Sequence, residues 1–257
     1  MKRRVNLIPM AGAGQRFVDE GYSLPKPLIP IDGMPMILKA AMALPPADVW
    51  IFICRTEHLV LTPLRETLTE YFPGAQIVEV KELTAGQAAT CLLARHLLQH
   101  DDELVIGACD NSMIYDHMLH EDLLKDNDAL IWTFRHNPAV LQNPKMYGWV
   151  ETGDNKKACR VSVKVPISTD PMNDHAVIGA FSFRRAGDFI QCADQMIAAN
   201  RRINNEFYAD EVMNVAIENG LTTVVMEAES YVCFGTPRDL NTYNYWRHIF
   251  KHSSFQQ

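Results

Sequence analysis

The sequence predicts one α/β domain of Rossmann-like type, with a mixed, mostly parallel sheet flanked by helices. The first observation is size and composition: 257 residues, 47% hydrophobic and 21% charged, suffice for a single large core. The second is that apolar runs, beginning with 5–10 and 49–54, alternate with segments of helical periodicity, as in βαβ units. The third is that a glycine-rich turn and an aspartate follow two of these runs, where such sheets bind ligands.

The individual elements follow from apolar content and period. Short apolar runs predict strands at 5–10, 49–54, 75–80, 103–109, 129–134, 176–183 and 222–227. Apolar residues that recur every three or four positions predict helices at 34–44, 57–71, 84–100, 116–127, 188–200, 210–219 and 238–250. Gly220 follows one of these segments as a C-terminal helix stop. No internal repeat or low-complexity tract interrupts the pattern.

Charge and cysteine usage exclude several classes of protein. A net charge of -7 argues against a basic nucleic-acid surface. No apolar run approaches the ~18–20 residues of a membrane helix, and the run after Lys2-Arg3-Arg4 is too short for a signal peptide. The six cysteines are scattered without a C-x-x-C pair, which favours reduced thiols in a cytoplasmic protein.

The glycine-rich turn follows the first predicted strand. Residues 11–14 read Ala-Gly-Ala-Gly, and such small residues let the backbone approach a ligand and offer it successive N–H groups. Arg16 lies just past the turn. Lys26 stands between Pro25 and Pro27, which predicts a stiff, extended segment that aims its ammonium group. The turn is therefore a candidate polyphosphate site, positioned by amides and neutralised by two cations.

Two common glycine-rich sites do not fit this turn. The dinucleotide-binding G-x-G-x-x-G would have Phe17 at its third glycine, and no G-x-x-x-x-G-K-[ST] string occurs in the chain. The pattern G-x-G-x-R-[FM] followed by P-K-P-[LM] matches residues 12–17 and 25–28. In this the chain resembles the nucleotidylyltransferases that join an NTP to a sugar 1-phosphate or a similar phosphate. The resemblance extends over almost the whole chain, and implies one domain of nucleotide-diphospho-sugar transferase type over 1–257.

The resemblance implies that about 1–135 form a nucleotide-binding half. Arg16 would hold the β- and γ-phosphates, and Lys26 the α-phosphate. Gly86 and Gln87 match an element that lies beside the base, although a plain helix cap is the alternative reading. The other implied nucleotide-binding residues form the turn itself: Met10, Ala11, Gly12, Ala13 and Gly14.

Asp110 ends the apolar run at 103–109 and is the candidate metal ligand. A carboxylate there can hold Mg²⁺, which keeps several waters while bridging substrate phosphates. Asp110 also matches the family's metal-binding aspartate, and so is implied to bind the nucleotide through Mg²⁺. A turn cap is the alternative. A glycosyltransferase of similar topology would carry D-x-D, but Ser112 stands where the second acid would be.

The resemblance places the acceptor-binding half at about 136–250. Gly148 matches a glycine that approaches the acceptor, and Lys164 a lysine that contacts the acceptor phosphate and serves catalysis. Val163 replaces the glutamate that usually precedes this lysine, and an exposed strand lysine is the alternative. Gly179 would leave room for the acceptor. Glu206, in an N-E-F-Y element, could accept hydrogen bonds from it, or merely cap a helix.

Cys233 is the main departure from the family. Many members place a second metal-binding aspartate at this position, and a thiolate is a poor ligand for Mg²⁺. Either one protein carboxylate suffices with phosphates and water, or Asp210 or Glu211 substitutes.

The resemblance as a whole implies transfer of a nucleotidyl group from an NTP to a phosphorylated small molecule, with Mg²⁺ and release of pyrophosphate. CTP is favoured, because the N-E-F-Y element recurs in bacterial cytidylyltransferases, and cell-surface polysaccharide precursors are the expected products. A dTTP- or UTP-dependent sugar-1-phosphate enzyme is the alternative, as are a glycosyltransferase and a non-catalytic nucleotide-binding protein. Neither nucleic acid nor membrane insertion is expected. The aromatic stripe of 238–250 would pack on the domain or on a second subunit of a homodimer.

Overall fold

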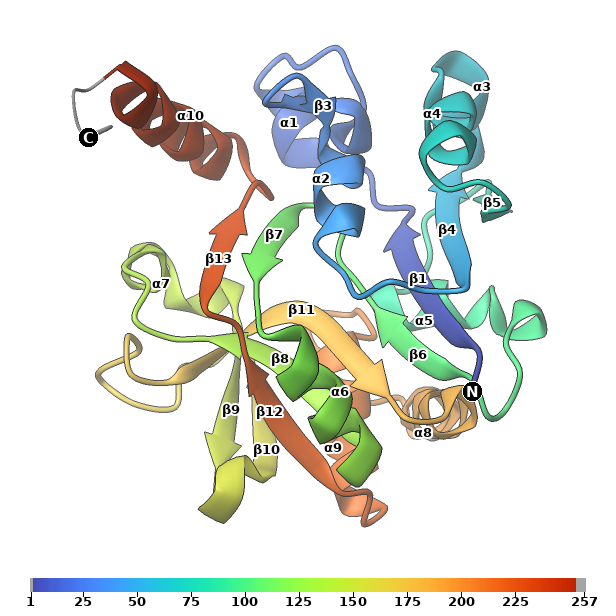
Figure 1. Ribbon diagram of the computed structural model, residues 1–257, viewed down its shortest axis with the longest axis vertical. Helices are drawn as coiled ribbons and strands as arrows, with labels where there is room; N and C mark the ends of the chain where they lie inside the picture. Colours follow the sequence, from blue (N-terminus) through green and yellow to red (C-terminus); the bar gives the residue numbers. More distant parts are fainter. Residues whose placement is uncertain (1, 253–257) are drawn as a thin grey trace.

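The computed structural model describes residues 2–252, which form a nine-stranded sheet with helices on both faces (Figure 1). The strands of this sheet are β1 (Arg4–Met10), β4 (Val49–Arg55), β5 (Gln76–Val80), β6 (Glu103–Ile106), β8 (Ala129–Phe134), β9 (Gly148–Thr152), β10 (Ala158–Val163), β11 (His175–Phe183) and β12 (Thr223–Glu227). Two short antiparallel pairs accompany it: β2 (Pro30–Ile31) with β3 (Met34–Pro35), and β7 (Asn111–Ile114) with β13 (Ser230–Cys233). The α-helices are α1 (Gln15–Asp19), α2 (Met36–Met42), α3 (Thr56–Leu61), α4 (Leu64–Tyr71), α5 (Gln87–Leu92), α6 (His117–Asp126), α7 (Ala139–Gln142), α8 (Ala186–Ala198), α9 (Ala209–Glu218) and α10 (Pro237–His252).

The sheet is mixed and mostly parallel, as predicted. β5, β4, β1 and β6 are parallel neighbours, and β12 is parallel to β8. β11 lies antiparallel between β6 and β8, and the β9–β10 hairpin joins its first residues. Within this sheet β10 and β11 run opposite to the other strands. Since β11 belongs to the second half of the chain, its insertion beside β6 joins the two halves in one sheet.

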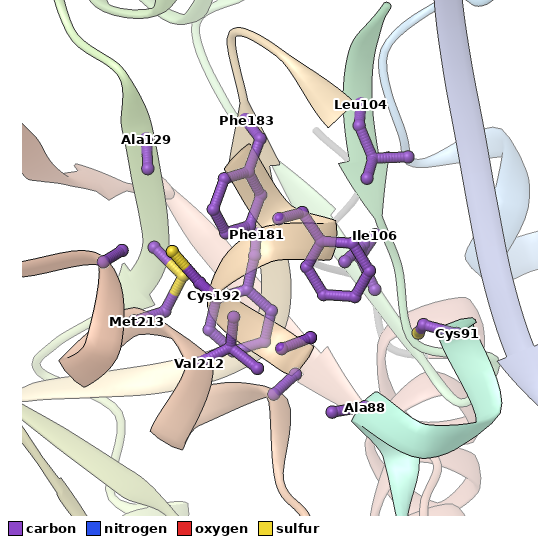
Figure 2. Packing of buried hydrophobic residues seen from close by; sticks show 14 of the residues in the cluster. Ala88, Cys91, Leu104, Ile106, Ala129, Phe181, Phe183, Cys192, Val212 and Met213 are labelled. Carbon is purple, nitrogen blue, oxygen red and sulfur yellow. The ribbon is translucent and has the colours of Figure 1, made fainter. Parts of the chain in front are cut away.

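Alternating side chains of the strands build two cores, one on each face of the sheet. Val5 and Leu7 of β1 pack with α5, α8 and α9, while Ile8 and Met10 pack with α2, α4 and α6. Figure 2 shows part of the first core, where Phe181 of β11 lies among side chains from the flanking elements.

A third, smaller core lies beside the glycine-rich turn. Phe17 of α1 and Ile29 pack there against Phe234 and Leu240 from the end of the chain. This contact holds the loop that carries Arg16 and Lys26 against the segment after β13.

Two predicted helices differ from the structure. The helix expected at 57–71 is divided into α3 and α4, because Thr62 is extended and Pro63 precedes the first residue of α4. The helix expected at 84–100 shortens to α5, which is followed by a 3₁₀ turn at Arg95–Leu97. The short elements α1, α7, β2, β3, β7 and β13 were not predicted, and neither was the β9–β10 hairpin.

α10 extends from β13 at the end of the described chain (Figure 1). Leu240 is buried, and the Tyr243 hydroxyl donates a 2.6 Å hydrogen bond to Asp32. Farther along, Tyr245, Trp246 and Phe250 are exposed. Among residues 2–252, no helix has the length and apolar character needed to traverse a bilayer.

Candidate active site

A cavity of about 520 Å³ lies at the carboxyl end of β6 and receives side chains from both halves of the chain. The carboxyl ends of parallel strands are where open α/β sheets bind ligands. The sequence-predicted residues that line it are Arg16, Lys26, Gln87, Asp110, Gly148, Lys164 and Gly179. Groups predicted separately from distant segments therefore share one cavity.

The turn at Gly14 places Lys26 in this cavity. Gly14 has φ +64°, and a Cβ added to it would lie 3.2 Å from the Cβ of Lys26, so a larger residue would be strained and tightly packed. The prediction that Lys26 lies in an extended segment is wrong. Pro25 is extended, but Lys26 begins a 3₁₀ turn over Lys26–Leu28, because Leu28 N–H donates back to the carbonyl of Pro25.

Lys26 and Asp110 form an ion pair inside the cavity. Burial opposes protonation of Lys26, but the carboxylate of Asp110 outweighs it, and the net effect raises the lysine pKa above its usual range. Lys26 is therefore cationic at every physiological pH. The pair presents a fixed positive charge and a carboxylate side by side.

Arg16 projects from α1 into the same cavity and is exposed. Among residues 2–252, no carboxylate lies within 4.0 Å of its guanidinium group. Its charge is therefore available to an anion in the cavity.

The β7–β13 pair fixes the other side of Asp110. Asn111 lies opposite Cys233 in this pair, and Phe234 N–H donates a 2.8 Å hydrogen bond to the carbonyl of Asp110. A Cβ added to Gly235 would lie 2.9 Å from Asp110 Oδ2. Gly235 was not assigned a role from the sequence, although it opens the G-T-P segment, and here it gives the carboxylate its space.

The donor set around Asp110 fits Mg²⁺ in its simplest form, one protein carboxylate completed by phosphates and water. Among residues 2–252, no group of three His, Cys, Asp or Glu side chains could hold a metal ion. Burial, with Asp110 and Asp239, raises the pKa of Cys233 to about 12, so this neutral thiol is a poor ligand. Glu211 is not a substitute, because Arg201 and Asn214 each donate a 2.6 Å hydrogen bond to it.

Lys164 enters the cavity from the end of β10. It has φ +65°, and its ammonium group donates a hydrogen bond to the carbonyl of Met146 and lies 5.3 Å from the ring centre of Tyr208. Burial lowers the pKa of Lys164, and Arg16 lowers it further, while Asp210 opposes the shift. Lys164 is thus a half-buried cation that lines the same cavity as Arg16 of α1.

Gly148 and Gly179 each have a structural reason for lacking a side chain. An added Cβ at Gly148 would lie 2.1 Å from Asp210 Oδ1. Gly179 has φ +90° and lies at a β-bulge in β11, next to Ile178, whose carbonyl accepts a 2.9 Å hydrogen bond from Asn111. The bulge ties the two halves of the chain together at the cavity.

Several predicted residues do not line the cavity. Met10 and Ala11 are buried, and the rest of the turn at 12–14 adjoins Arg16 and Lys26 without contributing to the lining. Gly86 packs against the backbone, since an added Cβ would lie 2.5 Å from Phe207 N. Glu206 is exposed and contacts the hydroxyl of Tyr208, which does line the cavity. The ligand-binding roles of these residues stay predictions.

The lining also contains residues that the sequence did not single out as ligand contacts. Asp210 had been considered only as a metal ligand. Lys145 and Tyr147 lie in the segment that was used to identify Gly148, and Tyr208 in the one that was used for Glu206. Their closeness in sequence to Gly148 and Glu206 is the feature from which Lys145, Tyr147 and Tyr208 could have been predicted.

A second cavity of about 500 Å³ lies at the opposite end of the strands, where β1 and β6 begin. Its basic residues include Arg4 and Arg184, which pair with Glu121 and Asp128 respectively. We assign the chemistry to the first cavity, because it lies at the carboxyl ends of the strands and holds the Lys26–Asp110 pair.

No protein-family model and no curated protein sequence matches the chain. Solved structures do. The chain is similar to a nucleoside-diphosphate-sugar pyrophosphorylase from Vibrio cholerae RC9, with a TM-score of 0.74, 20% identity, and coverage of 93% of this chain and 98% of that one. It is similar to the inositol-1-phosphate CTP transferase from T. maritima, with a TM-score of 0.71, 14% identity, and coverage of 96% and 95%.

A third similar structure is a candidate glucose-1-phosphate thymidylyltransferase from Bacillus anthracis, with a TM-score of 0.69, 17% identity, and coverage of 99% of this chain and 98% of that one. At such identities the likeness concerns the fold. The chain has the fold of the sugar-phosphate nucleotidylyltransferases, as its glycine-rich turn and P-K-P segment predicted.

Proposed function

We propose that the protein transfers a nucleotidyl group from an NTP to a phosphorylated small molecule or sugar 1-phosphate and releases pyrophosphate. The observation that carries this proposal is the shared cavity, which is lined by Arg16, Lys26 and Lys164 and holds the ion pair of Lys26 with Asp110. The lining carries four cationic side chains, since Lys145 joins these three, and two acids, Asp110 and Asp210. This excess of positive charge suits a triphosphate better than it suits a neutral ligand.

The reaction proposed is an in-line displacement. A phosphate oxygen of the acceptor forms a bond to the α-phosphorus of the NTP, while the bond from that phosphorus to the oxygen bridging to the β-phosphate breaks. Because the nucleophile is already anionic, no general base is required. Catalysis is then positioning and charge neutralisation.

The cations supply most of the charge stabilisation. A cation at about 4 Å from a phosphate charge contributes roughly 4 kcal/mol at an effective dielectric near 20. Backbone amides at a helix N-terminus contribute roughly 0.3–1 kcal/mol. We therefore assign the α-phosphate to Lys26, the β- and γ-phosphates to Arg16, and the acceptor phosphate to Lys164. Met10 to Gly14, Gly86, Gln87, Gly148, Gly179 and Glu206 would shape the nucleotide and acceptor sites.

Mg²⁺ is the proposed cofactor, held by Asp110 and phosphate oxygens. When bound, it would neutralise charge on the phosphates. The rest of the work falls to the chain itself: Lys26 holds its proton and its position beside Asp110, and Gly235 keeps the space around that carboxylate.

CTP is the favoured nucleotide, and the T. maritima CTP transferase of similar fold supports this choice. The B. anthracis protein supports dTTP as the alternative. We further propose a cytoplasmic enzyme that supplies precursors of cell-surface polysaccharide, and a homodimer joined through α10. A non-catalytic nucleotide sensor is the second candidate, favoured by Cys233, because its thiol stands beside Asp110 where a second acid would help bind metal.

The test is a grid of CTP, dTTP, UTP, ATP and GTP against phosphorylated acceptors, with Mg²⁺ and with pyrophosphate as the readout. We expect release for one nucleotide with one class of acceptor. Nucleotide binding without release across the grid would favour the sensor. A reaction that uses only a preformed sugar nucleotide would identify a glycosyltransferase.

A further inference from the structure

Asp210 is a buried acid whose carboxylate receives a hydrogen bond from its own backbone N–H but from no other of residues 2–252. It lies in the first turn of α9, is 9% exposed, and lines the candidate active-site cavity. Among residues 2–252, no other residue donates a hydrogen bond to its carboxylate, and no lysine or arginine nitrogen lies within 4.0 Å. A buried carboxylate in this condition is costly, so its presence calls for a ligand that donates to it.

The other buried acids of residues 2–252 are all paired. Asp102 accepts hydrogen bonds from Arg3 at 2.8 Å and from Gln99 N–H at 2.7 Å. Asp188 accepts one from Arg185 at 2.9 Å. Glu211, next to Asp210 in the chain, is held by Arg201 and Asn214 at 2.6 Å. Among the buried acids of residues 2–252, Asp210 therefore differs in receiving no hydrogen bond from another residue.

The space for the carboxylate is built by a neighbouring strand. Asp210 Oδ1 lies 2.1 Å from the point where a Cβ of Gly148 would stand, so any larger residue at 148 would collide with it. A Cβ at position 148 would also lie 3.2 Å from Val177 Cγ2. Packing, rather than hydrogen bonding, keeps Asp210 at the cavity.

The charges around Asp210 indicate which part of a ligand it meets. Lys164, the cation that acts electrostatically on Asp210, already donates to the carbonyl of Met146. Arg16, which acts electrostatically on Lys164, lines the same cavity. A phosphate would be drawn to these cations, and a group carrying O–H or N–H would be drawn to the acid. Metal binding is the less suitable role, because no three-ligand cluster exists within residues 2–252 and the ammonium group of Lys164 acts electrostatically on this carboxylate.

We propose that Asp210 determines acceptor specificity by binding a hydroxyl or ammonium group on the acceptor skeleton. This rests on the proposed nucleotidyl transfer. The acceptors are then phosphorylated sugars, polyols or amino alcohols, and simple alkyl phosphates are excluded. The acceptor is recognised at two ends, by its phosphate at Lys164 and by its donor group at Asp210.

The test is calorimetric titration with four probes: glucose 1-phosphate, glycerol 3-phosphate, phosphoethanolamine and ethyl phosphate, each with and without α,β-methylene CTP. The wild type should bind at least one donor-bearing probe about tenfold or more tightly than ethyl phosphate. Asp210→Asn should reduce this preference to about threefold or less and should not weaken the binding of ethyl phosphate, because the change removes a negative charge from the cavity. The loss should be larger for phosphoethanolamine if the donor is an ammonium group, since asparagine carries no charge.

Asp188→Asn is the matched control. It makes the same change to a buried acid in the first turn of α8, away from the cavity, and should keep the wild-type preference. A thermal melt of each variant confirms folding. The proposal is overturned if the wild type binds no probe, if it does not distinguish the probes, or if the preference survives in Asp210→Asn. Because the titration requires no turnover, a wild type that distinguishes the probes but releases no pyrophosphate refutes only the transfer reaction.

Discussion

Lys26 is the residue on which the proposed chemistry depends most directly, because it is the cation paired with Asp110. We expect Lys26→Met to lower turnover by more than about 100-fold, since the methionine keeps the length but not the charge that stabilises the transition state. Pyrophosphate release measures turnover, and circular dichroism checks the fold. Lys39→Met, which removes a lysine paired with Asp32 at 3.1 Å outside the cavity, is the control and should retain activity. Near-normal turnover in Lys26→Met would refute its role.

Asp210 gives a prediction about stability at the same scale. Burial raises the pKa of Asp210, although Lys164 opposes the shift, so the folded protein resists its ionisation. In the unfolded chain this acid ionises near pH 3.9, and stability is lost as pH rises from there through the folded pKa. Asp210→Asn should therefore raise the unliganded Tm at pH 7, and the gain should vanish near pH 3. A lower Tm at pH 7 would show that the carboxylate has a stabilising partner.

The sequence predicted the shared location of those residues that lie in short, recognisable patterns. Arg16, Lys26 and Asp110 lie in short patterns, and the structure brings all three to one cavity. The sequence did not predict that the Asp210 side chain adjoins Gly148 in the cavity lining, because nothing near position 210 reveals that Gly148 leaves it space. It also missed the 3₁₀ turn at Lys26, where the preferences of the two prolines suggested extended backbone.

The β7–β13 pair adjoins Asp110, and Gly235, two residues after β13, is the glycine at which an added Cβ would meet its carboxylate. We expect Gly235→Ala to lower turnover by about 10- to 100-fold, because the new Cβ would stand 2.9 Å from Asp110 Oδ2 and 3.2 Å from Cys233 Sγ. Gly153→Ala is the control, since its Cβ would also meet a cysteine sulfur at 3.2 Å, but outside the cavity. The measurement is turnover with melting temperature. Equal activity in the two variants would mean that Asp110 tolerates displacement.

Most elements that lie in a clear apolar run were predicted, and several short elements without one were not. β1, β4, β8 and β12 match their apolar runs closely. α1 has five residues and β7 and β13 four each, too few for a period to be detected. Their formation depends on contacts between distant segments, such as Asn111 opposite Cys233.

At the scale of the whole molecule, the cavity depends on the antiparallel position of β11 between β6 and β8. β11 pairs with both β6 and β8, which brings Gly179 beside the segment that follows β6. The sequence predicted an α/β sheet, but the antiparallel insertion was not readable from it, since strand order depends on long-range pairing. The two halves of the site are therefore a consequence of topology rather than of any local pattern.

α10 carries the last prediction, which concerns assembly. Trp246 and Phe250 stack on each other with ring centres 6.0 Å apart and are 53% and 59% exposed, an apolar surface of a kind that marks association sites. We expect light scattering to give the mass of two chains for the wild type and of one chain for the double variant Trp246→Glu, Phe250→Glu, because burying two carboxylates in the interface is unfavourable. Val60→Glu, at a 74% exposed position on α3, is the control and should stay dimeric. A monomeric wild type at micromolar concentration would contradict the proposed dimer. Since neither aromatic residue lines the candidate active-site cavity, turnover per chain should be similar in both states.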